Sequence, residues 1–142
     1  MRGYLIDTNV LSELRKPGRN AAVVDWFSSI FSERLYLSVL TLGELRRGVE
    51  MLRIRDAHSA GALDRWIAAV RSQFSDRIIG VDEEVAERWG QMSPRRPVPV
   101  IDGLLAATAL AHDLAVVTRN TADFERSGVT VLNPFDQKKA EP

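Results

Sequence analysis

The chain lacks cysteine, and it also lacks long apolar runs and any excess of charge of one sign. Without cysteine there can be neither a disulfide framework nor a thiolate metal site. No apolar run approaches the roughly 20 residues that a membrane-spanning helix needs. Asp7 and Asn9 interrupt the apolar residues near the N-terminus, so we expect no signal region there. These absences favour a cytoplasmic protein with no membrane partner.

The charged residues balance, with 19 Lys and Arg against 19 Asp and Glu. A net charge of zero argues against a strongly basic coat for nucleic acid. Histidine is scarce, and His58 and His112 are too far apart in the sequence to suggest a metal-binding pair. The chain has no nucleophile elbow, no phosphate-binding Walker loop and no dinucleotide fingerprint. Candidate chemistry therefore rests on the carboxylates and the arginines.

Length and pattern together predict one α/β domain. A chain of 142 residues that is 45% hydrophobic can build a single core. Short apolar runs at residues 4–6, 35–38, 78–81, 115–118 and 129–132 alternate with helical patterns at about 8–15, 22–30, 40–55, 63–74, 82–92, 100–112 and 120–126. This alternation predicts a central parallel sheet of four or five short strands between two layers of helices. We expect residues 1–135 to form the domain and 136–142 a polar tail.

Two further expectations follow from the pattern along the chain. Residues 53–59 are polar and are predicted to connect two helices. The segment 101–111 is apolar on nearly every face, which predicts a central, buried helix.

Four acidic residues occupy positions where such a fold can bring them together. Asp7 ends the first apolar run, Asp102 begins a helix and Asp123 follows the fourth apolar run. Glu44 lies early in the helical stretch 40–55. Ligands of parallel α/β sheets bind at the carboxyl ends of the strands. Clustered carboxylates raise one another's pKa, and a hard cation such as Mg²⁺ or Mn²⁺ would relieve that cost.

Each of these acids also has a possible structural role. Asp7 can cap a helix, and Asp102 can favour the positive end of a helix dipole. Glu44 can be a solvated helix residue paired with Arg47, although Gly43 and Gly48 leave space around its side chain.

The fourth acid and the loop before the third have comparable alternatives. Asn120 and Asp123 resemble a capping arrangement, with Asn120 as the N-cap. Arg95 and Arg96 lie shortly before Asp102 and could contact phosphates, or they could belong to a solvated loop. The side chain of Thr118, at a strand end, could orient water.

Four segments in order resemble the motifs of one known family. They read LIDTNVL (5–11), SVLTLGELRRG (38–48), IDGLLAATA (101–109) and VTRNTADF (117–124). Together they resemble the acidic motifs of PIN-domain ribonucleases, in particular the VapC toxins of VapBC toxin–antitoxin pairs, of the FitB-like type. The resemblance extends from Tyr4 to Phe135. A single motif of this kind is weak, but four in order are specific.

The resemblance implies an endoribonuclease that uses Mg²⁺, or alternatively Mn²⁺, and hydrolyses RNA with water activated by the cation. It implies Asp7, Glu44, Asp102 and Asp123 as catalytic and metal-binding residues, with Thr8, Asn9, Thr118 and Asn120 beside them and Arg46, Arg95, Arg96 and Arg119 as RNA contacts. Some members have an acid at the position of Asn120, so either Asn120 or Asp123 could contact the cation. It further implies a homodimer and a cognate VapB-type antitoxin.

Two other classes of function stay open on the sequence alone. A phosphotransfer module with an aspartyl phosphate also places an Asp after the first strand, but it normally has a Lys at a late strand end. Here no Lys occurs between Lys16 and Lys138. A non-catalytic PIN-like domain that binds RNA or protein would keep the fold and lose the dependence on metal.

Overall fold

The computed structural model describes residues 1–92, 95 and 97–136. In chain order the elements are β1 (Gly3–Ile6), α1 (Thr8–Leu14), α2 (Ala21–Ser29), the 3-10 turn η1 (Ser32–Arg34), β2 (Leu35–Ser38), α3 (Val39–Arg53), α4 (Ala57–Gln73), β3 (Ile78–Ile79), α5 (Glu83–Gly90), α6 (Val100–His112), β4 (Leu114–Val117), α7 (Thr121–Glu125), β5 (Val131–Leu132) and the 3-10 turn η2 (Pro134–Asp136). Apart from Asp136, the predicted polar tail lies outside the described residues.

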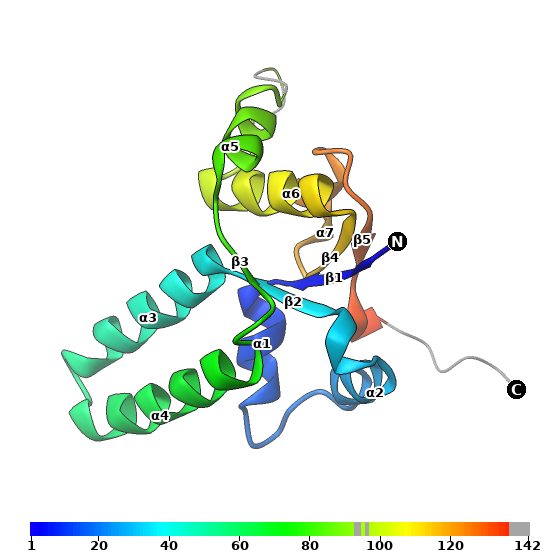
Figure 1. The fold of residues 1–142 in the computed structure, drawn as a ribbon. Coiled ribbons are helices and arrows are strands. Elements are labelled where there is room, and N and C mark those ends of the chain that lie inside the picture. The colour runs from blue at the N-terminus through cyan, green and yellow to red at the C-terminus, as the bar shows by residue number, and fades with distance from the viewer. Residues whose placement is uncertain (93–94, 96, 137–142) are drawn as a thin grey trace, which may run out of the picture.

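Five parallel strands form the sheet, in the order β3-β2-β1-β4-β5. Figure 1 shows α1 to α4 on one face of this sheet and α5 to α7 on the other. The prediction of a parallel sheet between two helical layers is confirmed. Since β1 is central, the chain crosses from one side of β1 to the other between β3 and β4, and such a point is where open α/β sheets bind ligands.

Alternate residues of the strands supply two separate cores. Ile6 and Val117 face α1 to α4, whereas Leu5 and Val116 face α6 and α7. All four residues are at most 1% exposed. Because both faces of the inner strands are covered, the strands read as continuous apolar runs and not as alternating ones.

Several helices begin where a polar side chain accepts hydrogen bonds from their first backbone N–H groups. These N-cap residues are Asp7, Asn20, Ser38, Asp56 and Asp82. Asp7 stands directly between β1 and α1, and Ser38 is the last residue of β2 before α3, so each cap also fixes the turn that leaves the sheet.

Two expectations from the sequence are wrong in detail. The predicted connection at 53–59 is shorter, because Asp56 caps α4 and that helix begins at Ala57. The edge strands β3 and β5 have two residues each, since each has only one neighbouring strand. Helix α6 is buried on all faces over Leu105 to Ala109, as the sequence predicted, whereas Ile101 and Leu110 are 36% and 37% exposed.

None of the helices in the described part of the chain is long and apolar enough to cross a membrane.

Candidate active site

Three adjacent strands, β2, β1 and β4, end at the same edge of the sheet. Asp7 follows β1, Thr118 follows β4, and Glu44 lies in the second turn of α3, the helix that follows β2. Asp102, in the first turn of α6, interacts electrostatically with Asp7, Glu44 and Asp123. The fold thus gathers the four acids that the sequence predicted, and Asp102 lies within electrostatic reach of the other three.

Asp7 is held by hydrogen bonds from both sides of the β1–β4 pair. Its Oδ1 accepts from the backbone N–H of Thr8 at 2.8 Å. Its Oδ2 accepts from the hydroxyl of Thr118 at 2.8 Å and from the Asn9 side-chain amide at 3.2 Å. Asp7 is only 7% exposed, and burial raises its pKa, with a further contribution from the charge of Glu44. The hydrogen bonds from Thr118 and Thr8 oppose that rise.

Asn9 and Thr118 also fix each other across the strand end. The Asn9 amide donates to Thr118 Oγ1 at 3.2 Å, and its Oδ1 accepts from the backbone N–H of Arg119 at 3.1 Å. The backbone N–H of Asn120 donates to Thr118 Oγ1 at 3.0 Å. These bonds join the turn after β1 to the turn after β4 beside Asp7.

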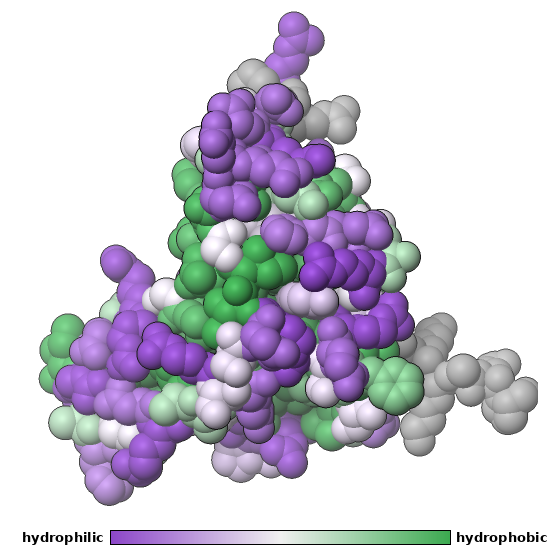
Figure 2. Space-filling model, viewed as in Figure 1, coloured by the Kyte–Doolittle hydropathy of each residue, from purple (hydrophilic) through white to green (hydrophobic). Residues whose placement is uncertain are grey.

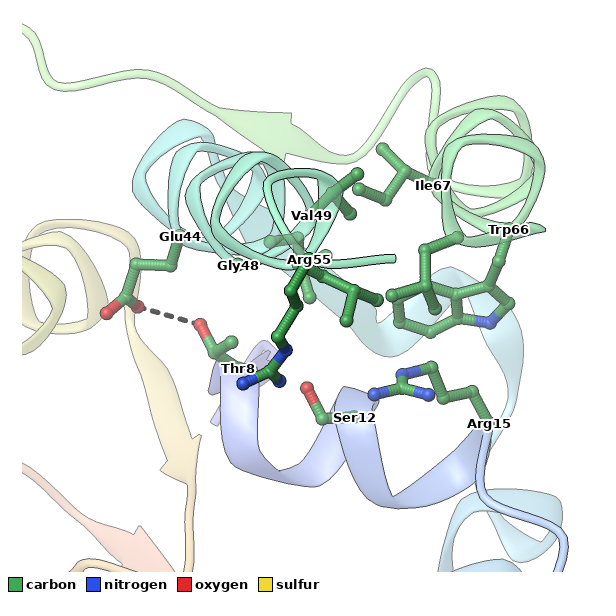
Figure 3. A pocket seen from close by; sticks show the side chains of 12 residues that line it. Thr8, Ser12, Arg15, Glu44, Gly48, Val49, Arg55, Trp66 and Ile67 are labelled. Carbon is green, nitrogen blue, oxygen red and sulfur yellow. Dashed lines mark hydrogen bonds between the residues drawn. The ribbon is translucent and has the colours of Figure 1, made fainter. Parts of the chain in front are cut away.

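Glu44 points toward the acid cluster and not along its own helix. Its Oε1 accepts a hydrogen bond from the hydroxyl of Thr8 at 2.7 Å (Figure 3). Within the described residues Arg47 forms no ion pair with it, so the structure does not show the alternative of a local pairing. A Cβ placed on Gly43 or Gly48 would meet nothing within 4 Å, which confirms the expected open space around Glu44.

Asp102 carries the least compensated charge of the four. No hydrogen bond or ion pair to its carboxylate occurs among the described residues. Burial and the charges of Asp7, Asp123 and Glu44 raise its pKa to about 6. The next residue, Gly103, lets α5 approach, because a Cβ there would lie 3.1 Å from the ring of Trp89. The indole therefore packs against α6 one residue beyond the carboxylate.

Asp123 and Asn120 interact, but not as a capping box. Asn120 stands at the N-cap position of α7, yet its side chain makes no cap hydrogen bond. Its amide instead donates to Asp123 Oδ2 at 3.0 Å. Asn120 thus occupies the N-cap position that the capping alternative gave it, but its side chain turns toward Asp123 and does not cap the helix.

The four carboxylates offer oxygen atoms that can bind a cation, although they do not surround a common point. Among the residues described, no three His, Cys, Asp or Glu side chains are close enough to form a metal-binding group as they stand. The donors are nevertheless hard oxygens, which Mg²⁺ and Mn²⁺ prefer. The raised pKa values of Asp7 and Asp102 mark uncompensated negative charge that a divalent cation would neutralise.

The predicted RNA-binding arginines differ in their surroundings. Arg46 already pairs with Asp64 and Glu50. The guanidinium of Arg119 lies over the ring of Phe135, 3.8 Å from its centre. Arg95 is exposed, and Arg96 lies outside the described residues.

The structure has a groove beside the four acids. It has a volume of about 400 Å³ and lies between α1, α3 and α4. Its lining includes Thr8 and Glu44, which the sequence predicted as site residues. It also includes Ser12, Arg15 and Arg55 (Figure 3), which the sequence did not single out. The sequence offers only a weak signal for two of these residues. Ser12 and Arg15 follow Thr8 by four and seven residues, a spacing that places all three on one face of α1.

Comparison with known proteins supplies the family context. The PIN domain model matches residues 4–128. The toxin FitB of Neisseria gonorrhoeae is 37% identical over 136 residues, which cover 92% of this chain and 97% of FitB. The VapC ribonuclease Y4jK of Sinorhizobium fredii is 31% identical, with 93% of this chain and 97% of that protein covered. The crystal structure of FitAcB from Neisseria gonorrhoeae has a TM-score of 0.88 at 36% identity, with coverage of 94% of this chain and 99% of that one.

Proposed function

The chain belongs to the PIN-domain family, and on that premise we propose that it is the toxin of a type II toxin–antitoxin pair and acts as a metal-dependent endoribonuclease. Relatives that bear the names toxin FitB and VapC ribonuclease support this assignment. The observation that carries it is the placement of Asp7 and Glu44, both hydrogen-bonded to Thr8, at the carboxyl edge of the sheet, within electrostatic reach of Asp102. We place the protein in the cytoplasm, where its RNA substrate would be, and treat residues 1–135 as one domain.

Asp7, Glu44, Asp102 and Asp123 are the residues proposed to hold the cation, with Mg²⁺ preferred and Mn²⁺ as the alternative. When bound, such a cation acidifies water and neutralises charge at the scissile phosphate. Asp102 is proposed as a direct ligand because no protein hydrogen bond to its carboxylate occurs among the described residues. For Asp123 we propose no specific mode of contact with the cation, because the Asn120 amide already donates a hydrogen bond to one of its carboxylate oxygens.

The polar neighbours position these carboxylates. Thr8 donates a hydrogen bond to Glu44, while Thr118 and Asn9 donate to Oδ2 of Asp7. Asn120 does the same for Asp123. Groups that fix the orientation of metal ligands commonly matter 10- to 100-fold for affinity or activity, so we include all four in the site.

We assign a VapB-type antitoxin as the partner. A toxin–antitoxin complex from Klebsiella pneumoniae, which matches this chain at 26% identity with a TM-score of 0.67, supports this assignment. An Arg of the antitoxin would bind the acid cluster, because a guanidinium matches carboxylates in bidentate geometry. A flanking segment would fill the groove past Leu45, Leu52 and Trp66. Val70, on the same helix as Trp66, is 5% exposed and belongs to the core, so it does not line the groove.

A homodimer is proposed as well. Figure 2 shows an apolar area over the start of α3, β3 and the start of α6. Val39 and Val100, the first residues of those helices, are 42% and 60% exposed. A second copy would remove these side chains from water.

One assay separates this function from its alternatives. The purified chain and an Asp102→Asn variant are incubated with a mixed cellular RNA pool in Mg²⁺, in Mn²⁺ or in EDTA. The proposal expects cleavage by the wild type with metal only, and none by the variant. Binding without cleavage would favour a non-catalytic domain. Acyl phosphate or beryllofluoride trapping at Asp7 would favour the phosphotransfer module, for which the buried, hydrogen-bonded carboxylate of Asp7 is poorly placed.

A further inference from the structure

The groove between α1, α3 and α4 opens directly from the acid cluster. Thr8 and Glu44, which hydrogen-bond to each other, line it together with Ser12, Arg15 and Arg55. In Figure 3 the guanidinium groups of Arg55 and Arg15 lie on the two sides of Ser12, over helix α1. From Thr8 to Arg15 the helix rises about 10 Å. Donor groups therefore continue away from the carboxylates along one wall.

The two arginines of this wall are not held in ion pairs with acids in the described part of the chain. Neither Arg15 nor Arg55 forms an ion pair or a side-chain hydrogen bond in the part of the chain that the structure describes. Asp56, the acid next to Arg55 in the chain, interacts with it electrostatically but accepts its hydrogen bonds from Ser59 as the cap of α4. Arg53, two residues before Arg55, instead pairs with Glu50 and Asp64. The groove thus presents two cations that are available to an anion.

The opposite wall is apolar and carries an aromatic ring. It consists of Leu45, Val49, Leu52, Leu63, Trp66 and Ile67. Trp66 is only partly buried, so one part of its indole is accessible from the groove (Figure 3). A cationic wall facing an aromatic side chain is the arrangement that binds single-stranded nucleic acid, because phosphates meet the cations while bases stack on the ring.

We infer that the RNA strand runs from the acid cluster through this groove, with its phosphates on Arg55, Ser12 and Arg15 and an unstacked base against Trp66. This inference rests on the proposed nuclease function and adds the residues that position its substrate. An RNA fits better than an acidic peptide as the natural ligand of the two arginines, because a strand whose scissile phosphate lies at the carboxylates must continue past Thr8. The antitoxin would then inhibit by excluding the strand from the same groove.

Binding of RNA under conditions of no cleavage tests the inference. Arg15→Gln, Arg55→Gln and Trp66→Leu are placed in an Asp102→Asn background, with Arg71→Gln on the exposed part of α4 as the matched control. A short fluorescein-labelled RNA of mixed sequence is titrated by anisotropy at several salt concentrations in Mg²⁺. Each phosphate contact to a single strand contributes about 0.7 to the slope of log K against log salt.

We expect Arg15→Gln and Arg55→Gln each to lower that slope by about 0.7, while Arg71→Gln leaves it unchanged. Arg55→Lys should restore the slope, since the ammonium still neutralises a phosphate. Trp66→Leu should weaken binding by about 5- to 150-fold without changing the slope, the range that loss of one stacked base implies. Thermal unfolding verifies that each variant is folded.

Two outcomes would overturn the inference. One is an unchanged slope in both arginine variants, measured with a wild-type chain that cleaves the mixed RNA pool. The other is loss of affinity for the antitoxin in these variants with RNA affinity kept, which would make the groove a peptide site alone. A wild-type chain that does not cleave the pool in either metal would instead reject the proposed function itself, so the two failures are distinguishable.

Discussion

The hydroxyl of Thr8 donates a hydrogen bond of 2.7 Å to the carboxylate of Glu44, although 36 residues separate them. Thr8 is the first residue of α1, and Glu44 lies on α3, so the bond joins the turn after β1 to the helix after β2. It holds Glu44 toward Asp7, whose pKa its charge helps to raise. A helix residue that could have been a solvated surface charge thereby becomes part of the acid cluster.

Thr8→Val should weaken metal binding and cleavage by about 10- to 100-fold, the range for groups that orient a metal ligand. Valine keeps the shape of the side chain but cannot donate to Glu44. Thr8→Ser, which keeps the hydroxyl, is the matched control and should stay close to wild type. Calorimetric titration with Mn²⁺ measures the effect. Wild-type affinity in Thr8→Val would show that Glu44 needs no positioning.

Asp7→Asn should abolish cleavage and toxicity while the fold survives. The amide oxygen can still cap α1, but the amide NH2 cannot accept the hydrogen bonds that Thr118 and Asn9 now donate to Oδ2. Removal of a buried charge offsets that loss, so the unfolding free energy of the metal-free protein should stay within about 1 kcal/mol of wild type. Denaturant unfolding in EDTA and an RNA cleavage assay measure the two effects. Full activity at limiting Mg²⁺ would remove Asp7 from the site.

The stability of the metal-free protein should depend on the ionisation of Asp102. Its pKa is raised from 3.8 to about 6 in the folded state, so the folded protein holds this proton more tightly than the unfolded chain does. Stability should therefore fall as the pH rises from about 4 to 6 and then level off. Asp102→Asn should reduce this fall, with a remainder from Asp7, whose pKa is also raised.

Melting temperatures measured in EDTA across this pH range test that prediction. Saturating Mg²⁺ should remove the fall, because the cation binds the ionised carboxylates of the folded protein. The same slope in wild type and Asp102→Asn would mean that the charge of Asp102 is already compensated.

Asp123→Ala should cost less activity than Asp102→Ala. Asn120 already donates to Asp123, and Arg126 lies 3.8 Å from its other oxygen, whereas the neighbours of Asp102 are other acids. We expect a loss of metal affinity of about 10-fold for Asp123→Ala and a larger one for Asp102→Ala. Equal losses by calorimetry would identify both carboxylates as direct ligands.

The antitoxin should inhibit through an Arg that enters the acid cluster. Replacing that Arg should weaken inhibition, and Mg²⁺ should compete with it, because both neutralise the same carboxylates. Inhibition constants at increasing Mg²⁺ measure the competition. Full inhibition by an antitoxin that crosslinks near neither Asp7 nor Asp102 would refute this mode of inhibition.

The sequence by itself determined the elements of the fold and the order of the acids along it. Local signals were sufficient there: apolar runs covered on both faces became inner strands, and Asp7 and Asp82 cap the helices that follow them. The resemblance of four ordered motifs predicted the family, and the domain match over residues 4–128 confirms it. These features depend on neighbours in the chain, so they can be predicted without knowledge of the tertiary structure.

Only the tertiary structure decided which partner each polar side chain takes. Glu44 had a local choice, Arg47, and a distant one, Thr8, and it bonds to the distant one. Asn120 could have capped α7, but its amide turns to Asp123 while its backbone N–H bonds to Thr118. Competing hydrogen bonds of about 1 kcal/mol each are too similar in strength for local sequence to choose between them. Packing of α1 and α3 against the sheet makes that choice, and the same packing lines the groove with Arg15 and Arg55, which are 40 positions apart in the chain.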